Sequence, residues 1–200
     1  MRHEMTRRGL GAAVFASALA MAAGPALALN ESVARDLVQR LVDEINGVIA
    51  SGAPTSKMID QFEGIFKRYA DTSYVAAYAM GADARRASSA QKSAFSEAFN
   101  TYVARKYGQR FQEFAGGKLE IQEVRDRKKF YEVVTLARLP GKSPFEVTFL
   151  ISDRSGKDQF YNLFVEGVNM LLTEREEVGS ILDANGGDID AMTADLRSKG

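Results

Sequence analysis

The amino-acid sequence predicts an α+β fold: a single domain with a curved four-stranded antiparallel sheet that is packed on one face by several helices. Three observations support this class. Apolar residues recur at helical spacing from residue 30 to about residue 115. From Lys118 the period changes, and four short segments rich in β-branched and aromatic residues follow one another. The turns between these segments have the length of hairpin loops, which join neighbouring antiparallel strands.

The first 28 residues have the three parts of a secretory signal peptide. A start with three arginines precedes an uncharged apolar middle, and the segment closes on Ala26-Leu27-Ala28. A membrane anchor is the alternative reading of this segment. However, the uncharged run 9–29 is mostly Ala and Gly, whereas a spanning helix needs about 20 strongly apolar residues. We therefore expect cleavage after residue 28, which leaves a domain of residues 29–200 in the periplasm.

The route of export stays open between two alternatives. Arg7 and Arg8, in the stretch TRRGL, resemble a twin-arginine export signal, which a receptor recognises. A weakly hydrophobic middle suits that route, but paired arginines also occur in signals of the general secretory route.

Composition excludes several kinds of site. Without the first 28 of the 200 residues, 172 remain, a size that fits one domain. The chain has no cysteine, and its only histidine is His3, within the expected signal. This excludes disulfides, thiolate or imidazole metal sites and His-dependent nucleophiles, so we expect no metal and no catalytic residue. The mature chain has 23 basic and 25 acidic residues, and this balance does not point to nucleic acid as a partner.

Three helices are expected first. Apolar residues keep helical spacing from Asn30, a plausible N-cap, to the breaking stretch Gly52-Ala53-Pro54. A second helix is expected at Thr55–Tyr69. A short third helix carries Tyr74 and Tyr78 and ends near Gly81.

A capping box predicts the start of a longer fourth helix. Ser88 stands three residues before Gln91, and a long aromatic stretch follows. We expect this helix to bend at Gly108 and to continue through Phe111 until Gly116. One face of the helix carries Phe95, Phe99, Tyr102 and Val103.

Four strands are expected in the segments KLEIQEV, KFYEVVTLARL, SPFEVTFLISD and KDQFYNLFVEG. They are separated by a charged turn, by PGK and by RSG, so the strands form an antiparallel meander. In FEVTFLI, alternate residues from Phe145 to Ile151 point to one face, which is strongly apolar. A helix around Met170–Leu182 and a last helix at Asp188–Arg197 complete the domain.

Charged residues offer little chemistry by themselves. Glu166 and Arg175 are candidates for a pair at the corner where the last strand meets the next helix, and a structural ion pair or backbone anchor is favoured there over a catalytic carboxylate. The spacing of the aspartates does not match a dedicated calcium loop. A basic cluster occupies a hairpin tip, where a solvated turn is favoured over contact with lipid phosphates or an acidic partner. Its members are Arg125, Arg127, Lys128 and Lys129.

The order of these elements, together with three stretches of sequence, is similar to the MlaC family. Members of this family are periplasmic carriers of the Mla retrograde phospholipid transport system, also known as toluene-tolerance auxiliary transport proteins. The resemblance covers essentially all of the mature chain. The matching stretches are SSAQKSAFSEAFNTYVARKYGQRFQEFAG, FEVTFLISDRSGKDQFYNLFVEGVNMLLTERE and ILDANGGDIDAMTADLRSKG.

The family pattern includes a capped helix with recurring Phe and Tyr, and a strand that ends in a Val-Glu-Gly-Val corner followed by an Arg. The matching positions are Ser88, Gln91, Phe95, Phe99, Tyr102, Tyr107, Val165, Glu166, Gly167, Val168 and Arg175. In the last strand the family often has a Trp and an Asp. This chain has Phe160 or a neighbouring residue in place of the Trp, and Asn162 in place of the Asp. Asn169 replaces the usual Ser, and Glu174 replaces the usual aromatic residue.

The resemblance implies an apolar cavity between the helices and the sheet, which holds phospholipid acyl tails while the headgroup stays outside. The implied partners are phospholipid and the inner-membrane and outer-membrane Mla complexes, with the carrier itself a monomer. Such a carrier needs no catalytic residue and no cofactor other than its phospholipid cargo. The residues expected to bind lipid are Phe95, Phe99, Tyr102, Val103, Val133, Val147, Phe149, Ile151, Leu163, Val165 and Val168.

Two other functions stay open. An enzyme on the same cup-shaped α+β architecture would have to use carboxylates alone. A periplasmic protein-binding module would use its apolar surface to hold a partner helix. The many Phe and Tyr residues are also compatible with a filled core, which is the plainest reading of composition alone. Phospholipid that co-purifies with the protein would favour the carrier over both alternatives.

Overall fold

The computed structural model describes residues 29–109, 114 and 116–199. The expected signal segment 1–28 lies outside the described residues, and so does the expected continuation of the fourth helix over residues 110–113. Within the described residues the elements are α1 (Glu31–Ala50), α2 (Thr55–Tyr69), α3 (Thr72–Met80), the 3-10 helix η1 (Gly81–Arg85), α4 (Ser89–Gly108), β1 (Lys118–Asp126), β2 (Tyr131–Arg138), β3 (Phe145–Ser152), β4 (Gln159–Val165), β5 (Val168–Asn169), α5 (Met170–Ala184) and α6 (Ile189–Ser198).

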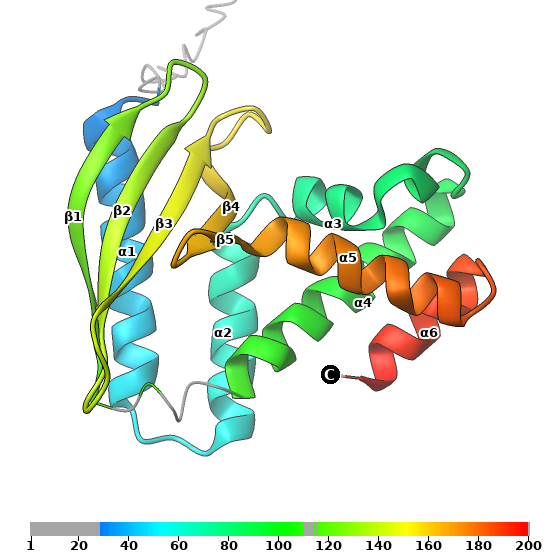
Figure 1. The fold of residues 1–200 in the computed structure, drawn as a ribbon, viewed down its shortest axis with the longest axis horizontal. Helices are drawn as coiled ribbons and strands as arrows, with labels where there is room; N and C mark the ends of the chain where they lie inside the picture. The colour runs from blue at the N-terminus through cyan, green and yellow to red at the C-terminus, as the bar shows by residue number, and fades with distance from the viewer. Residues whose placement is uncertain (1–28, 110–113, 115, 200) are drawn as a thin grey trace, which may run out of the picture.

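The α+β class is confirmed, with an antiparallel sheet on one side of the molecule and most of the helices on the other. Figure 1 shows α1 and α2 upright beside the sheet, and α3, α4, α5 and α6 in a separate helical layer. α1 packs on β1 and β2, and α2 packs on both α1 and α4.

The helix starts follow the capping residues that the sequence predicts. The Asn30 side chain accepts a hydrogen bond from the Val33 N–H at 3.1 Å. Ser88 and Gln91 form the expected capping box, in which each side chain accepts from the other's backbone N–H. The Gln91 amide also donates to Asp190 at 3.0 Å and thereby joins the first turns of α4 and α6. These bonds satisfy N–H groups that a helix leaves unpaired at its start.

The sheet is a meander, with its strands in the order β1-β2-β3-β4-β5 among the described residues. The four expected strands are present, and the very short β5 is added to them. It forms because Glu166 and Gly167 both have positive φ, at 50° and 79°, which is the geometry of a tight two-residue hairpin turn. β1 is interrupted by a register shift between Ile121 and Glu123, where a bulge bends the strand.

Side chains in register form rows across the inner face of the sheet. Val147 pairs with Thr135 on one side and with Val165 on the other. The next row contains Phe149, between Val133 and Leu163. Paired residues in an antiparallel sheet point to the same face, so these rows face the helices together.

The corner between β4 and α5 is fixed by side-chain hydrogen bonds. Asn162 is buried in β4, and its Oδ1 accepts from the backbone N–H of Leu171 at 3.2 Å. Its amide nitrogen donates to Asn169 Oδ1, and the same oxygen accepts from the Leu172 N–H as the N-cap of α5. The first turn of α5 is therefore attached to the last long strand of the sheet.

Candidate functional site

An apolar cavity of about 490 Å³ lies between the inner face of the sheet and the helices. Helices α1, α2 and α4 supply one side of its wall, and β3, β4 and the start of α5 supply the other. Nearly all of the lining side chains are aliphatic or aromatic. Polar residues enter the wall at a few positions, which are Tyr107, Lys118, Tyr161, Asn162, Glu166 and Glu174.

Seven of the eleven residues expected to bind lipid lie in the wall of this cavity. They come from three parts of the chain, and the fold brings them together around one space. α4 contributes two of them, β3 and β4 contribute four, and β5 contributes one. They are Phe99, Val103, Val147, Phe149, Leu163, Val165 and Val168.

The other four residues lie elsewhere in the molecule. Phe95 is one helical turn before Phe99 on α4 and stacks on its ring, with centroids 5.6 Å apart. Val133 and Ile151 are completely buried where the inner face of the sheet is filled, toward the end that carries the β1–β2 and β3–β4 turns. Tyr102 directs its hydroxyl to Glu177 on α5. Their positions place these four in the packed core.

Two helices supply wall residues that the sequence did not single out. These residues belong to the apolar stripes of α1 and α2, which line the cavity opposite the sheet. Helical spacing identified the stripe but not the space in front of it. The residues are Leu41, Ile45, Ile49, Phe62, Ile65 and Phe66.

The wall of the cavity reaches the molecular surface at β5. Val168 lines the cavity and is 54% exposed, and Leu172, in the first turn of α5, is 42% exposed. They are the two large hydrophobic residues that stand out as exposed in the described part of the chain. The tight turn at Glu166 and Gly167 holds Val168 at this edge, so apolar surface continues from the interior to solvent.

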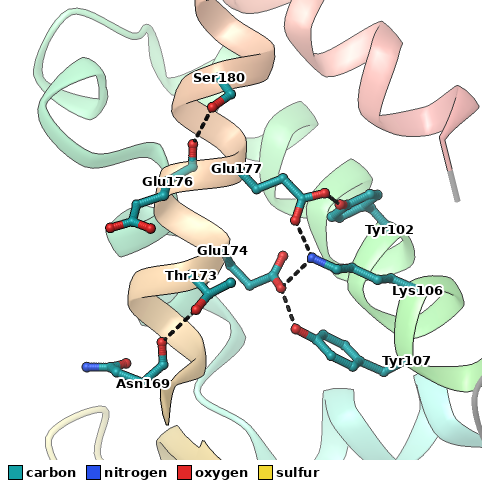
Figure 2. Close-up of polar contacts among 9 residues, drawn as sticks. All are labelled: Tyr102, Lys106, Tyr107, Asn169, Thr173, Glu174, Glu176, Glu177 and Ser180. Carbon is teal, nitrogen blue, oxygen red and sulfur yellow. Dashed lines mark hydrogen bonds and ion pairs between the residues drawn. The ribbon is translucent and has the colours of Figure 1, made fainter.

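A polar cluster lies against the cavity where α4 faces α5. Figure 2 shows Lys106 between two glutamates of α5. Its Nζ is 2.8 Å from Glu174 Oε1 and also pairs with Glu177. Tyr107 donates to Glu174, and Tyr102 donates to Glu177. We call these five residues the Glu174 cluster.

Burial and charge shift the pKa values within the Glu174 cluster. Burial, and then hydrogen bonding and charge from the glutamates, raise the pKa values of Tyr102 and Tyr107 far above that of a free phenol. Burial alone would lower the pKa of Lys106, but its bonds to Glu174 and Glu177 outweigh burial and raise it. The two phenols and the ammonium therefore remain hydrogen-bond donors at neutral pH.

The other charged candidates have structural surroundings. Arg175 lies over the ring of Tyr78, 5.3 Å from its centroid, and within the described residues no ion pair joins it to Glu166. Arg125 and Arg127 of the basic hairpin pair with Glu132. In the part of the chain that the structure describes, no group of three or more His, Cys, Asp or Glu residues is placed to bind a metal ion.

Among the described residues, no helix is both long enough and apolar enough to cross a bilayer.

A family model for the MlaC protein matches residues 35–198. The chain belongs to the MlaC family. The resemblance expected from the capped aromatic helix and the Val-Glu-Gly-Val corner is thereby confirmed, and the match extends over α1 to α6.

A solved structure shares the MlaC-type fold of this chain. It is described as the phospholipid-binding protein from Ralstonia solanacearum in complex with a phospholipid. The match has a TM-score of 0.71 at 16% sequence identity and covers 83% of this chain and 96% of that chain. At this identity the similarity establishes the fold.

Proposed function

We propose that this member of the MlaC family is a periplasmic phospholipid carrier that holds acyl tails in the apolar cavity. The observation that carries the proposal is the cavity itself, which is of ligand-pocket size, about 490 Å³, and is walled almost entirely by apolar side chains. The solved structure of similar fold is described as a phospholipid complex, which supports the same ligand class.

The energetics favour a carrier that exchanges lipid with partners. Moving a 16-carbon tail into water costs roughly 12 kcal/mol, at about 0.8 kcal/mol per CH₂. Transfer between a bilayer and an apolar cavity avoids most of that cost, since both surroundings resemble hydrocarbon. We infer that loading and release take place at membrane-bound partners, the inner-membrane and outer-membrane Mla complexes, and that the carrier works as a monomer.

Chemistry on the lipid is not part of the proposal. Two of the polar side chains in the cavity wall, Tyr107 and Glu174, are engaged with each other in the Glu174 cluster, and an imidazole or thiol nucleophile is not available to the mature chain. Binding and release, with no bond made or broken, is the function that this wall supports best.

Native mass spectrometry of protein purified from the periplasm tests the proposal. We expect a monomer whose mass exceeds that of the mature chain by one diacyl phospholipid, in near-stoichiometric amount. Lipid extraction from the same sample identifies the class of lipid. The apo mass alone, together with failure of delipidated protein to take up lipid from vesicles, would rule out the carrier function. Turnover of a substrate by lipid-free protein would favour an enzyme instead.

A further inference from the structure

One end of the apolar cavity is closed by three phenylalanine rings. Phe66 of α2, Phe149 of β3 and Phe160 of β4 are all buried, and all line the cavity. The ring centroid of Phe160 lies 6.0 Å from that of Phe66 and 5.8 Å from that of Phe149. Val133 and Ile151, their neighbours in the sheet, are fully buried, so core packing begins at these rings. We call the three rings the aromatic floor.

An irregularity in β4 places Phe160 in the floor. Phe160 and Leu163 are an odd number of residues apart, so they would lie on opposite faces of a regular strand. The register between β3 and β4 shifts between Leu150 and Ile151, so that Phe149 pairs with Leu163 and Ile151 pairs with Phe160. Phe149 and Ile151 both face inward, and therefore both of their partners do. The bulge in β4 thus turns the Phe160 ring toward the helices.

Hydrogen bonds to the backbone brace the aromatic floor. The N–H of Asp71 donates to the carbonyl oxygen of Phe160 at 2.8 Å, and Ala70 forms a parallel bridge with Phe160. The Gln159 side chain donates to the Ala70 carbonyl oxygen at 2.9 Å. The end of α2, which carries Phe66, is therefore attached to the strand that carries Phe160. Packed rings that are held in this way yield little to a ligand.

The depth of the cavity is close to the length of one acyl tail. Along β3 the cavity is lined from Phe145 to Phe149, a stretch of roughly 13 Å at about 3.3 Å per residue. The hydrocarbon core of a bilayer is about 30 Å thick, so one tail spans about 15 Å of it. The cavity reaches solvent at Val168. A tail of ordinary length can therefore extend from the opening to the floor.

We propose that the aromatic floor stops the methyl end of the acyl tail, and so sets the longest tail that this carrier holds. This inference rests on the proposed function, with the tails inside the cavity and the headgroup outside. A tail that has reached the floor cannot enter further, so the carbons that a longer tail adds stay at the opening in contact with water. Each CH₂ group left in water disfavours binding about fourfold relative to the bilayer. The cavity thereby selects phospholipids by tail length.

Competitive loading of delipidated protein tests the limit. The protein is incubated with vesicles of choline phospholipids in equal amounts, with monounsaturated tails of about 14 to about 24 carbons. Bound lipid is extracted and quantified by mass spectrometry, and each species is compared with its share of the vesicles. We expect similar ratios up to a limit of about 18 carbons, and a fall of at least about tenfold for each two carbons beyond it. Equal ratios at all lengths overturn the inference.

Two variants assign the limit to the floor. Phe149→Ala removes one ring and should raise the limit by about two to four carbons. Leu163→Phe adds a ring beside Phe149, where the cavity is open, and should lower the limit. Met192→Ala is the matched control, because it truncates a fully buried side chain of α6, away from the cavity, and should keep the wild-type limit. An unchanged limit in either floor variant, once folded, contradicts the inference, and so does an equal shift in Met192→Ala.

The outcomes separate the floor from the proposed function. Protein that takes up no phospholipid of any length refutes the carrier function, and the inference about the floor falls with it. Protein that takes up all lengths equally is still a carrier, but its floor does not stop the tail. Leu163→Phe leaves no empty space in the core, so it decides the matter if circular dichroism shows that Phe149→Ala does not fold.

Discussion

The side-chain amide of Asn162 donates a hydrogen bond to the side-chain oxygen of Asn169 at 3.0 Å. These are two of the positions at which the sequence departs from the family pattern, and in the structure they contact each other. Asparagine offers both donors and an acceptor, so one residue caps the helix while the other links it to the sheet. The departures therefore preserve a connected corner between β4 and α5.

We predict that Asn162→Leu lowers the free energy of unfolding by about 2–3 kcal/mol, because the buried N–H of Leu171 and the cap at Asn169 lose partners. Urea unfolding followed by circular dichroism measures the change. Gln122→Leu, an exposed polar position on β1, is the control and should change stability by less than about 0.5 kcal/mol. Equal effects of the two substitutions would show that the corner is not held by these bonds.

Val147 and Val133 provide a test of which part of the sheet faces open space. Both point to the inner face, but Val147 lines the cavity, whereas Val133 is fully buried in the core. We predict that Val147→Glu stays folded and loses most bound lipid, together with the stability that the ligand contributes. Val133→Glu places an unpaired charge in a filled core and should unfold the protein or cost several kcal/mol.

Circular dichroism and lipid extraction on the same samples measure both properties of the two valine variants. A folded Val147→Glu that still carries lipid would show that this side chain does not meet the ligand. If both variants unfold, the cavity at Val147 is effectively part of the core.

Two helical glycines should respond to alanine in opposite directions. A Cβ at Gly108 would lie 2.9 Å from Ile59 Cγ1 and 3.1 Å from its Cα, so α2 and α4 would have to move apart. A Cβ at Gly179 in α5 would have nothing within 4 Å. We predict that Gly179→Ala raises the free energy of unfolding by about 0.5–1 kcal/mol. Gly108→Ala should lower it by about 1–3 kcal/mol.

Thermal and urea unfolding of these two variants give the sign directly. If Gly108→Ala raised the free energy of unfolding, the space between Gly108 and Ile59 would have to be wide enough to hold a methyl group, contrary to the distances in the structure. Lipid content should be measured alongside, because α2 and α4 both contribute to the cavity wall.

Stability should decline at alkaline pH because of the phenols in the Glu174 cluster. The pKa of Tyr102 is raised by burial and by Glu177, above the reference value of 10.0. A raised pKa in the folded state gives stability that is complete below about pH 10 and is lost as pH rises further. We predict that Tyr102→Phe makes this decline shallower by about 1.4 kcal/mol per pH unit.

Urea unfolding at several values of pH above 10 measures this slope. Glu176→Gln, outside the cluster, should keep the wild-type slope. An unchanged slope in Tyr102→Phe would show that the Tyr102 hydroxyl ionises as easily in the folded protein as in the unfolded one.

Export gives the fifth prediction. The mature protein should begin at Leu29, after removal of the first 28 residues. N-terminal sequencing of periplasmic material checks this, and an intact Met1 or a membrane-retained protein would refute it. Replacing both Arg7 and Arg8 by Lys should block export if the twin-arginine route is used. Normal export of that variant would assign the general secretory route.

Much of the fold was predictable because local patterns and tertiary packing agree. α2 begins and ends at the expected residues, Thr55 and Tyr69, and the Ser88 capping box marks the start of α4 as predicted. Alternation along β3 correctly assigned its apolar face. β5 was missed because two residues are too few for a period. Its pairing depends on the positive φ of Glu166, which sequence spacing does not reveal.

The cavity wall was predictable only in part. Period-two alternation places Val133 and Val147 on the same kind of face but does not reveal whether a helix fills the space opposite. In the same way, Phe95 and Phe99 share one face of α4, but Phe95 lies in the core and Phe99, one turn later, lines the cavity. The Glu174 cluster joins residues about 70 positions apart, and the sequence offered Glu174 only as a departure from a pattern.

The bulged edge strand β1 has a consequence for behaviour at high concentration. The Asn46 side chain of α1 covers part of the outer edge of β1, because it accepts from the Leu119 N–H and donates to the Leu119 carbonyl oxygen. An uncovered edge strand is a template onto which a second copy of the chain can add a strand. The register shift after Ile121 bends this edge, and the ion pairs of Lys118 with Glu120 and of Arg125 with Glu123 place charge along it. Both features oppose strand addition, so β1 protects the protein against aggregation through its sheet.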